Sequence, residues 1–140
     1  MTNCDHYSGG GILPRSANYV RVGGSGTAIG AVQLCKSSTS YYWGYVVFYS
    51  TMPAGNWGQA YLHRYRNGTH IAVYSCDTSP QGPPSGGNGW VRPGQTRCWT
   101  PKVYAPSTSD TFQVLGLRCA SSHPSCSPSW YAWGYTAEVH

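Results

Sequence analysis

General acid–base catalysis is the first chemistry that the side chains of this 140-residue sequence suggest. A small ribonuclease needs a general base, a general acid and cations that hold the phosphate. Side chains of these types occur at His63, Arg64, His70 and Glu138. Adjacent residues of a strand point to opposite faces, however, which would separate His63 from Arg64. A small secreted nuclease is therefore an alternative function and not the main prediction.

The acidic residues do not indicate a glycosidase either. Such enzymes place two carboxylates on opposite sides of one bond. The acids of this chain lie in four different segments, at Asp5, Asp77, Asp110 and Glu138. No serine-hydrolase elbow, zinc-protease histidine pair or Cys-x-x-Cys motif occurs. We therefore expect a non-catalytic protein without a metal or cofactor.

The cysteines give the clearest structural signal, at Cys4, Cys35, Cys76, Cys98, Cys119 and Cys126. An even number at irregular spacing predicts three disulfides in a protein that works outside the cytoplasm. Six cysteines allow many pairings. We favour Cys119–Cys126 for its short loop and Cys76–Cys98 across a Pro/Gly-rich connection, which leaves Cys4–Cys35. His123 lies between Cys119 and Cys126, but that spacing fits a disulfide loop better than a zinc site.

Composition predicts a secreted protein with few charges. Charged residues make up 9% of the chain, against roughly 25% in ordinary soluble domains. The net charge is +5, but the basic residues are scattered, so nucleic acid is not an expected partner. No apolar run has the length of a membrane span, and no secretory leader is present. We expect no membrane partner, and a signal peptide that has already been removed.

The pattern of short strand-like runs predicts an all-β fold. These runs are rich in Val, Tyr, Trp and Thr, are separated by Gly, Pro, Ser or Asn, and cover residues 18–22, 28–35, 42–50, 58–66, 69–76, 97–99, 102–105, 112–118 and 130–139. No window has helical spacing of apolar residues. We expect a disulfide-stapled β-sandwich or small barrel of about eight strands over residues 18–140. Residues 1–17 should form a flexible N-terminal arm.

One hairpin can be predicted in detail. Asn67-Gly68 favours a two-residue turn in which both residues have positive φ. That turn would pair Arg66 with Thr69 and Tyr65 with His70. Continued without a break along both strands, the same register would pair Leu62 with Val73 and Tyr61 with Tyr74. One face of the hairpin would then carry Tyr61, His63, Tyr65, His70 and Tyr74. This aromatic face is either a second core layer or a partner-binding surface.

A Pro/Gly-rich connection of about 20 residues spans positions 77–96. Connections of this length inside a compact domain are usually functional or mobile. Trp90 lies near its middle and would either fix the connection to the body of the domain or contact a partner.

Two stretches resemble a known family. Gly30-Ala31-Val32-Gln33-Leu34, with Ser37 and Trp43-Gly44-Tyr45-Val46, is similar to the core motif of the YjfA-like family. Trp99-Thr100-Pro101-Lys102-Val103-Tyr104-Ala105-Pro106 resembles a later segment of that family. These are small secreted proteins of Gram-positive bacteria, abundant in actinomycetes. The family's usual cysteine between the serine and the tryptophan is missing here, and Cys35 follows Leu34 instead. The resemblance implies no catalytic residues.

The main functional prediction is a secreted interaction module that binds another extracellular protein. Some actinomycete proteins of similar size are adaptors in antibacterial toxin complexes, which dock through an N-terminal arm into a trypsin-like domain. In this chain Leu13-Pro14-Arg15 could supply such a docking peptide, or act as a protease inhibitor, because an acidic specificity pocket accepts arginine. The alternative is a carbohydrate- or cell-wall-binding module that stacks sugars on coplanar exposed aromatic rings.

Overall fold

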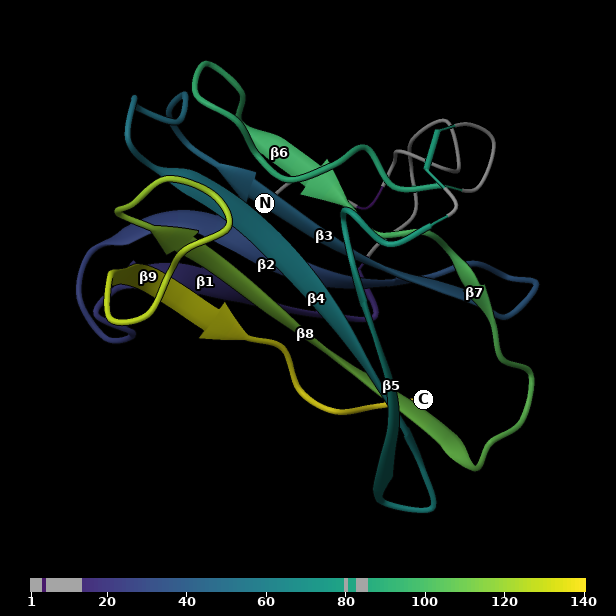
Figure 1. Cartoon of the computed structure of the whole chain (residues 1–140). Coiled ribbons are helices and arrows are strands. Elements are labelled where there is room, and N and C mark those ends of the chain that lie inside the picture. The colour runs from purple at the N-terminus through teal and green to yellow at the C-terminus, as the bar shows by residue number, and fades with distance from the viewer. Residues whose placement is uncertain (1–3, 5–13, 80, 83–85) are drawn as a thin grey trace.

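Nine β-strands form the protein in a computed structural model that describes residues 4, 14–79, 81–82 and 86–140 (Figure 1). The strands are β1 (Ser16–Val22), β2 (Ala28–Lys36), β3 (Tyr41–Phe48), β4 (Trp57–Arg66), β5 (Thr69–Ser75), β6 (Arg97–Trp99), β7 (Val103–Tyr104), β8 (Asp110–Cys119) and β9 (Trp130–Tyr135). Each lies where a strand-like run predicted it. The described residues include no helix that could cross a membrane.

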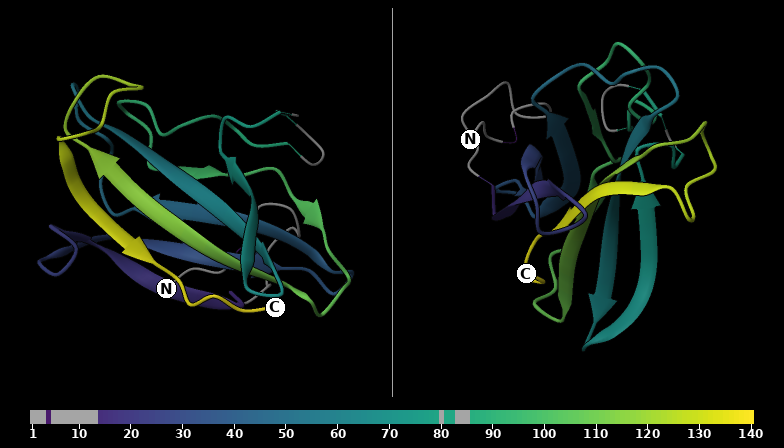
Figure 2. Two further views of the ribbon diagram at one scale, coloured as in Figure 1. Left: turned by 60° about the horizontal axis from the view of Figure 1, so that its bottom comes forward. Right: turned by 90° about the vertical axis from the view of Figure 1, so that its left-hand side faces the viewer.

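The strands build one antiparallel sheet that curls into a nearly closed barrel. Their order is β5-β4-β8-β9-β1-β2-β3-β6, and β7 pairs with β3. Figure 2 shows the sheet curving around its interior. The prediction of an all-β, disulfide-stapled sandwich or small barrel is thus confirmed in its barrel form. The sheet begins at Ser16, two residues before the predicted domain boundary. Residues 5–13 of the predicted arm lie outside the described part.

Alternate residues of the long strands fill the barrel. Leu62, Val114 and Phe112 point inward and are fully buried, together with Val32 and Val46 from the opposite strands. Period-two alternation explains why their sequence neighbours face outward. The outward face is also covered in two places, by separate apolar clusters.

One outer cluster lies on β2, β3 and β6. It contains Trp43 and Tyr45, packed against the buried Cys4–Cys35 disulfide. Trp43 is 1% exposed and is therefore a core residue. Its core is this outer layer, because the adjacent Tyr42 is the residue that belongs to the interior cluster.

All three favoured disulfides are present: Cys4–Cys35, Cys76–Cys98 and Cys119–Cys126. The second of them joins the two ends of the sheet, because Cys76 directly follows β5 and Cys98 lies in β6. Residues 86–91 of the Pro/Gly-rich connection run through the same seam. There Gly89 donates its N–H to the carbonyl of Cys76, and Trp99 donates its N–H to the Asn88 side chain. The connection therefore helps to close the barrel.

Gly87 should be required for this closure. A Cβ atom at this position would lie 2.5 Å from the Cys76 carbonyl oxygen and 2.8 Å from that of Trp99. Both contacts are with backbone, which cannot rotate away. We expect Gly87→Ala to lower the free energy of unfolding by about 1–3 kcal/mol. The measurement is urea unfolding of the oxidised protein. Ser79 is an exposed residue of the same connection, so Ser79→Ala should change the free energy of unfolding by less than about 0.5 kcal/mol. Equal losses in both variants would contradict a specific role of Gly87 in closing the barrel.

The hairpin between β4 and β5 has the predicted turn but a different register. Asn67 and Gly68 both have positive φ, 50° and 82°, as a two-residue turn requires. Arg66 pairs with Thr69 and Tyr65 with His70, as predicted. Beyond them a bulge shifts the pairing by one residue, so that Leu62 faces Tyr74. The predicted placement of Tyr74 on the outer aromatic face is therefore wrong. A turn sets only the pairs next to it, and a bulge inserts one residue into one strand.

Candidate functional site

An apolar groove of about 360 Å³ lies on the outer face of the sheet. Its floor comes from β4 and β8, where Tyr61 pairs with Leu115 and Trp57 with Cys119. Alternation places every second residue of these paired strands on the same face. The residues lining the groove are Trp57, Tyr61, His63, Val73, Leu115, Leu117, Pro124, Cys126 and Trp130.

The loop closed by the Cys119–Cys126 disulfide forms one wall of the groove. Pro124 and Cys126 of this loop line the cavity. The Trp57 indole holds the loop in place, because its Nε1–H donates to the Ser125 carbonyl over 3.0 Å. A short disulfide loop has little freedom to move away. The wall is therefore fixed by a covalent bond at its base and by a hydrogen bond near its tip.

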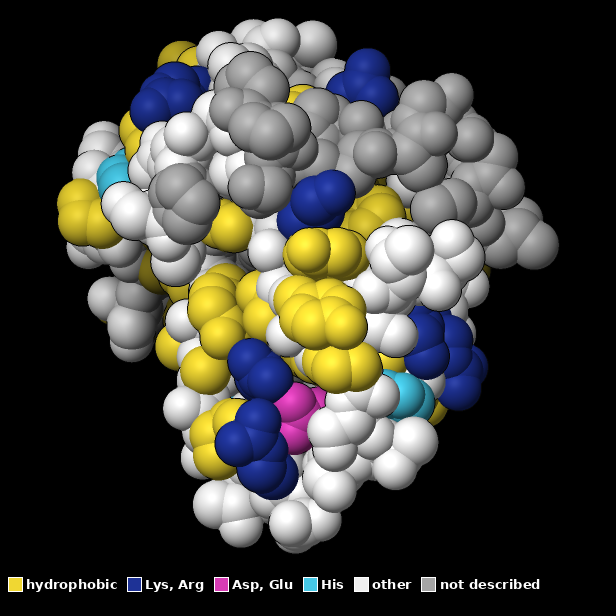
Figure 3. All heavy atoms as spheres, turned by 90° about the vertical axis from the view of Figure 1, so that its right-hand side faces the viewer, with side chains coloured by type: hydrophobic (Ala, Val, Ile, Leu, Met, Phe, Trp, Pro, Cys, Tyr) yellow, Lys and Arg dark blue, Asp and Glu magenta, His cyan; other side chains and the backbone are white. Residues whose placement is uncertain are grey.

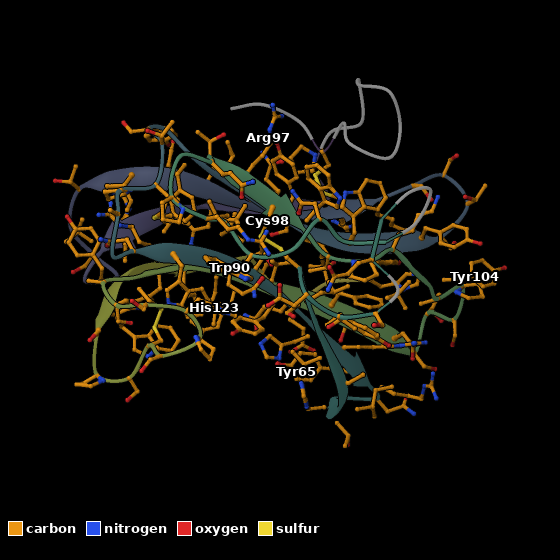
Figure 4. All side chains as sticks on the ribbon, turned by 45° about the horizontal axis from the view of Figure 1, so that its top comes forward. Tyr65, Trp90, Arg97, Cys98, Tyr104 and His123 are labelled. Carbon is orange, nitrogen blue, oxygen red and sulfur yellow. A yellow bond between two sulfur atoms is a disulfide. The ribbon has the colours of Figure 1, made fainter. Side chains whose placement is uncertain are left out.

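Trp90 supports this wall from behind. Its ring stacks on the ring of His123, with centres 4.2 Å apart and planes within 3° (Figure 4). The Arg92 guanidinium lies 4.6 Å from the Trp90 ring centre, and the backbone N–H of Trp90 donates to the Asp77 carboxylate. Trp90 thus fixes the Pro/Gly-rich connection to the disulfide loop. Of the two roles predicted for it, the structure shows the first, and a partner contact by Trp90 stays a prediction.

A histidine pair lies at the hairpin end of the groove. The distance from His63 Nδ1 to His70 Nε2 is 3.0 Å, and the Tyr65 ring packs edge-on against His70. Partial burial, and secondarily the nearby His70, lower the pKa of His63. The lowered pKa favours the neutral form of His63. The structure thus brings together four of the five predicted aromatic-face residues, Tyr61, His63, Tyr65 and His70.

The bulge exchanges two residues between the faces of the hairpin. Tyr74 turns inward and packs against the interior core, where it also interacts with Arg64. Val73 faces outward opposite His63 and lines the groove, half exposed. The sequence prediction had these two positions reversed. The expected separation of His63 from Arg64 is confirmed, since Arg64 binds Asp110 on the other face.

The strongest electrostatic cluster lies away from the groove, at one end of the barrel. Asp110 is 1% exposed and binds Arg64 at 2.6 Å and Arg66 at 2.8 Å. Hydrogen bonds from Arg66 and then Arg64 lower the pKa of Asp110 to about 2, against the opposing effect of burial. Figure 3 shows basic side chains around an acidic one on this side of the molecule, below a hydrophobic patch. Because the carboxylate is fully paired, it serves stability and not acid–base chemistry.

The other described carboxylates are also engaged. Asp77 accepts a hydrogen bond from Gln59 and lies 3.5 Å from His123, and Glu138 accepts one from Thr111. Within the described residues no three His, Cys, Asp or Glu side chains gather as metal ligands. The arrangement is suited to holding an apolar group in the groove, with imidazole and phenol groups at its rim.

Arg15, the last residue of the predicted docking peptide, is hydrogen-bonded to the sheet. The Arg15 N–H donates to the Leu34 carbonyl, and its Nε donates to the His140 carbonyl. Leu13 lies outside the described residues, and Pro14 is half-buried. Arg15 is therefore held by β2 and the C-terminal segment and does not hang on a free tether. Partner binding by Leu13, Pro14 and Arg15 stays a prediction.

Sequence reasoning missed most of the groove. The sequence pattern assigns Leu115, Leu117 and Trp130 to strands but to no site, and it assigns Pro124 only to a loop closed by a disulfide. One signal was available. The run Val114-Leu115-Gly116-Leu117 is apolar at every position, which indicates a strand covered on both faces.

Comparison with known proteins gives one informative similarity. Over 105 residues the chain is 34% identical to the uncharacterized protein YjfA of Bacillus subtilis (strain 168). The match supports a YjfA-like family. It covers 73% of this chain and 60% of YjfA, so the chain spans less than two thirds of that relative. No family model matches the chain, and no solved structure matches it.

The YjfA-like motifs fall on the scaffold and not on the groove. Residues 30–34 lie in β2 and residues 43–46 in β3, while residues 99–106 run from β6 through β7. The groove is built on β4 and β8, which these motifs do not include. The resemblance therefore describes the side of the barrel that carries the Cys4–Cys35 disulfide.

Proposed function

We propose that this protein is a secreted, non-catalytic module that binds another extracellular protein through the outer groove. The observation that carries the proposal is the groove itself: an apolar cavity on the outside of a nearly closed barrel, with Val73 and Trp130 both at least 40% exposed at its edge. Interfaces have apolar, aromatic-rich centres surrounded by polar residues. A fixed wall adds to affinity, because little ordering is needed on binding.

The charges of the protein define the chemistry of the partner. The net charge is +5 with only four acidic residues, and the three described ones all contact other side chains or backbone groups. An acidic partner would be attracted over a distance and would meet few like charges. We infer a protein segment with an aliphatic or aromatic side chain for the groove and acidic residues around it.

The disulfides and the similarity to YjfA suggest where the protein acts and from which kind of bacterium it comes. Three disulfides in a small all-β domain are compatible with an extracellular protein. The similarity to YjfA, together with the small size and low charge content of the chain, suggests a Gram-positive, actinomycete-type source. An adaptor in an antibacterial toxin complex, docked to a trypsin-like domain, is the narrowest form of this proposal. In that form Arg15, which does not line the groove, would supply a second contact with the partner.

Two variants at the edge of the groove test the proposal. A secreted partner captured on the immobilised protein would be identified, purified and titrated against each variant. Val73→Glu and Trp130→Ala should each weaken binding by more than about 2 kcal/mol, roughly thirtyfold, because an interface centre loses an apolar contact. Calorimetry or surface plasmon resonance gives the dissociation constants.

Matched controls separate the groove from general surface effects. Ile71→Glu changes a residue of the same strand that is similarly exposed, 45% against 49% for Val73, but does not line the groove. Tyr104→Ala removes an exposed ring from β7. Both should bind as wild type does. If Arg15→Ala abolishes binding while both groove variants retain it, the N-terminal arm is the docking element and the groove proposal fails.

Glycan binding is the second candidate, because four aromatic side chains are at least 38% exposed on β1 and β9 or beside them: Tyr19, Trp130, Tyr131 and Tyr135. A sugar platform needs coplanar rings, yet Trp130 and Trp133 meet at 87°. Tryptophan fluorescence titrated with soluble glycans and peptidoglycan fragments distinguishes the two functions. A saturable change with a glycan, lost in Trp130→Ala, would favour the carbohydrate-binding function.

A further inference from the structure

Two histidines from different strands bring their ring nitrogens together on the exposed face of the hairpin. His63 Nδ1 and His70 Nε2 are hydrogen-bonded at 3.0 Å, with ring centres 5.2 Å apart, so a metal ion held by both would take the place of the proton between them. His70 is exposed and His63 half-buried, so solvent reaches part of each side chain. Six residues separate them in sequence, and their contact depends on the strand pairing, so spacing alone does not indicate the pair.

The surrounding structure holds the pair in place. The Asn67-Gly68 turn and the Tyr65–His70 pairing fix the backbone of His70 relative to β4. Edge-on packing of Tyr65, with ring centres 5.2 Å apart at 70°, limits rotation of the His70 ring. A ligand that is oriented in advance binds a metal with less loss of freedom.

We propose that His63 and His70 together bind a divalent transition-metal ion, with Cu²⁺ preferred. Metal–imidazole bonds are about 2.0–2.1 Å long, so nitrogens 3.0 Å apart would subtend about 95° at the metal. That angle is close to the right angle between neighbouring ligands of a tetragonal Cu²⁺ or Ni²⁺ site and smaller than the tetrahedral angle of Zn²⁺. Two nitrogen ligands also disfavour Ca²⁺ and Mg²⁺, which prefer oxygen.

The coordination shell would remain open. Among the described residues no third His, Cys, Asp or Glu joins the pair in a metal-ligand group. The remaining positions would therefore be filled by water or by a donor from a bound molecule. Since His63 also lines the groove, the metal would lie at the edge of that cavity. This proposal does not depend on what the groove binds.

The test is titration of the full-length, oxidised protein with Cu²⁺, Ni²⁺ and Zn²⁺ salts alone, followed by calorimetry. Wild type should bind one Cu²⁺ at this site, and Ni²⁺ more tightly than Zn²⁺. Because two linked ligands bind far more tightly than one, His63→Gln and His70→Gln should each lower Cu²⁺ affinity about 100-fold. Electron paramagnetic resonance of the Cu²⁺ complex should show coupling to two imidazole nitrogens in wild type and to one in either variant.

His6→Gln and His123→Gln are the matched controls, because each removes a histidine outside the pair. Both should retain the wild-type affinity and the two-nitrogen spectrum. Thermal unfolding without metal verifies that each variant is folded. The proposal is overturned if the double variant, with both His63→Gln and His70→Gln, retains the wild-type Cu²⁺ affinity. It is also overturned if wild type shows no saturable Cu²⁺ binding, or if Zn²⁺ binds to wild type more tightly than Ni²⁺.

Discussion

Trp43→Ala should lower the free energy of unfolding by about 3–5 kcal/mol, although this side chain lies outside the barrel interior. The indole is 1% exposed and fills the space between β3 and the Cys4–Cys35 disulfide. Removing it leaves a cavity beside two cysteines that are fully buried and covalently joined. The measurement is guanidinium unfolding of the oxidised protein, followed by far-ultraviolet circular dichroism.

Two further variants make this result specific. Trp43→Phe should recover a large part of the loss, because it returns a ring to the cavity. Tyr49→Ala removes an aromatic ring that is 59% exposed, and it should change the free energy by less than about 0.5 kcal/mol. A loss below about 1 kcal/mol for Trp43→Ala would mean that the outer cluster adds little to the fold.

Asp110→Asn should destabilise the protein by about 3 kcal/mol at neutral pH. Arg64 has a side chain that is only 17% exposed and is paired with this carboxylate. An amide cannot neutralise it, so the variant leaves a positive charge largely buried. Arg66 is 52% exposed and should contribute less, because water can solvate it.

The same carboxylate predicts the acid response of the wild type. Its pKa is lowered from 3.8 to about 2 in the folded state, so its contribution is complete above the unfolded pKa and is lost as pH falls towards 2. Unfolding free energy should therefore fall by about 2 kcal/mol between about pH 5 and pH 2. Few other acids can contribute, since the chain has four. Asp110→Asn should show a nearly flat profile; an equally steep loss in this variant would rule out Asp110 as the cause.

The fold could be predicted from sequence to a large extent because its signals are local. Gly, Pro and Asn separate the strands, and Asn67-Gly68 specifies its own turn. The disulfide pairs followed from loop length and from the position of the Pro/Gly-rich connection. The bulge near Ile71 could not be predicted, because Ile71 and Ala72 are both apolar and either can be the inserted residue. That one residue decides whether Val73 or Tyr74 faces the groove.

The candidate site was harder to predict, since its parts are distant in sequence. Tyr61 and His63 were recognised from the alternation of a single strand. Leu115 joins them only through pairing between β4 and β8, and Pro124 only because a disulfide loop folds back over the sheet. Composition identifies the aromatic and apolar residues, but the register of the strands determines which of them meet.

The joining of β5 to β6 by Cys76–Cys98 affects how the molecule responds to proteases. Any cut in the connection between these cysteines would produce two polypeptides, and this is the disulfide that links them, since the other two each lie within one fragment. A nicked molecule would therefore keep both fragments and migrate as one species on a gel without reductant, and as two after reduction. In an environment rich in secreted proteases, the protein can lose the continuity of its backbone at its longest loop and still remain a single covalent unit.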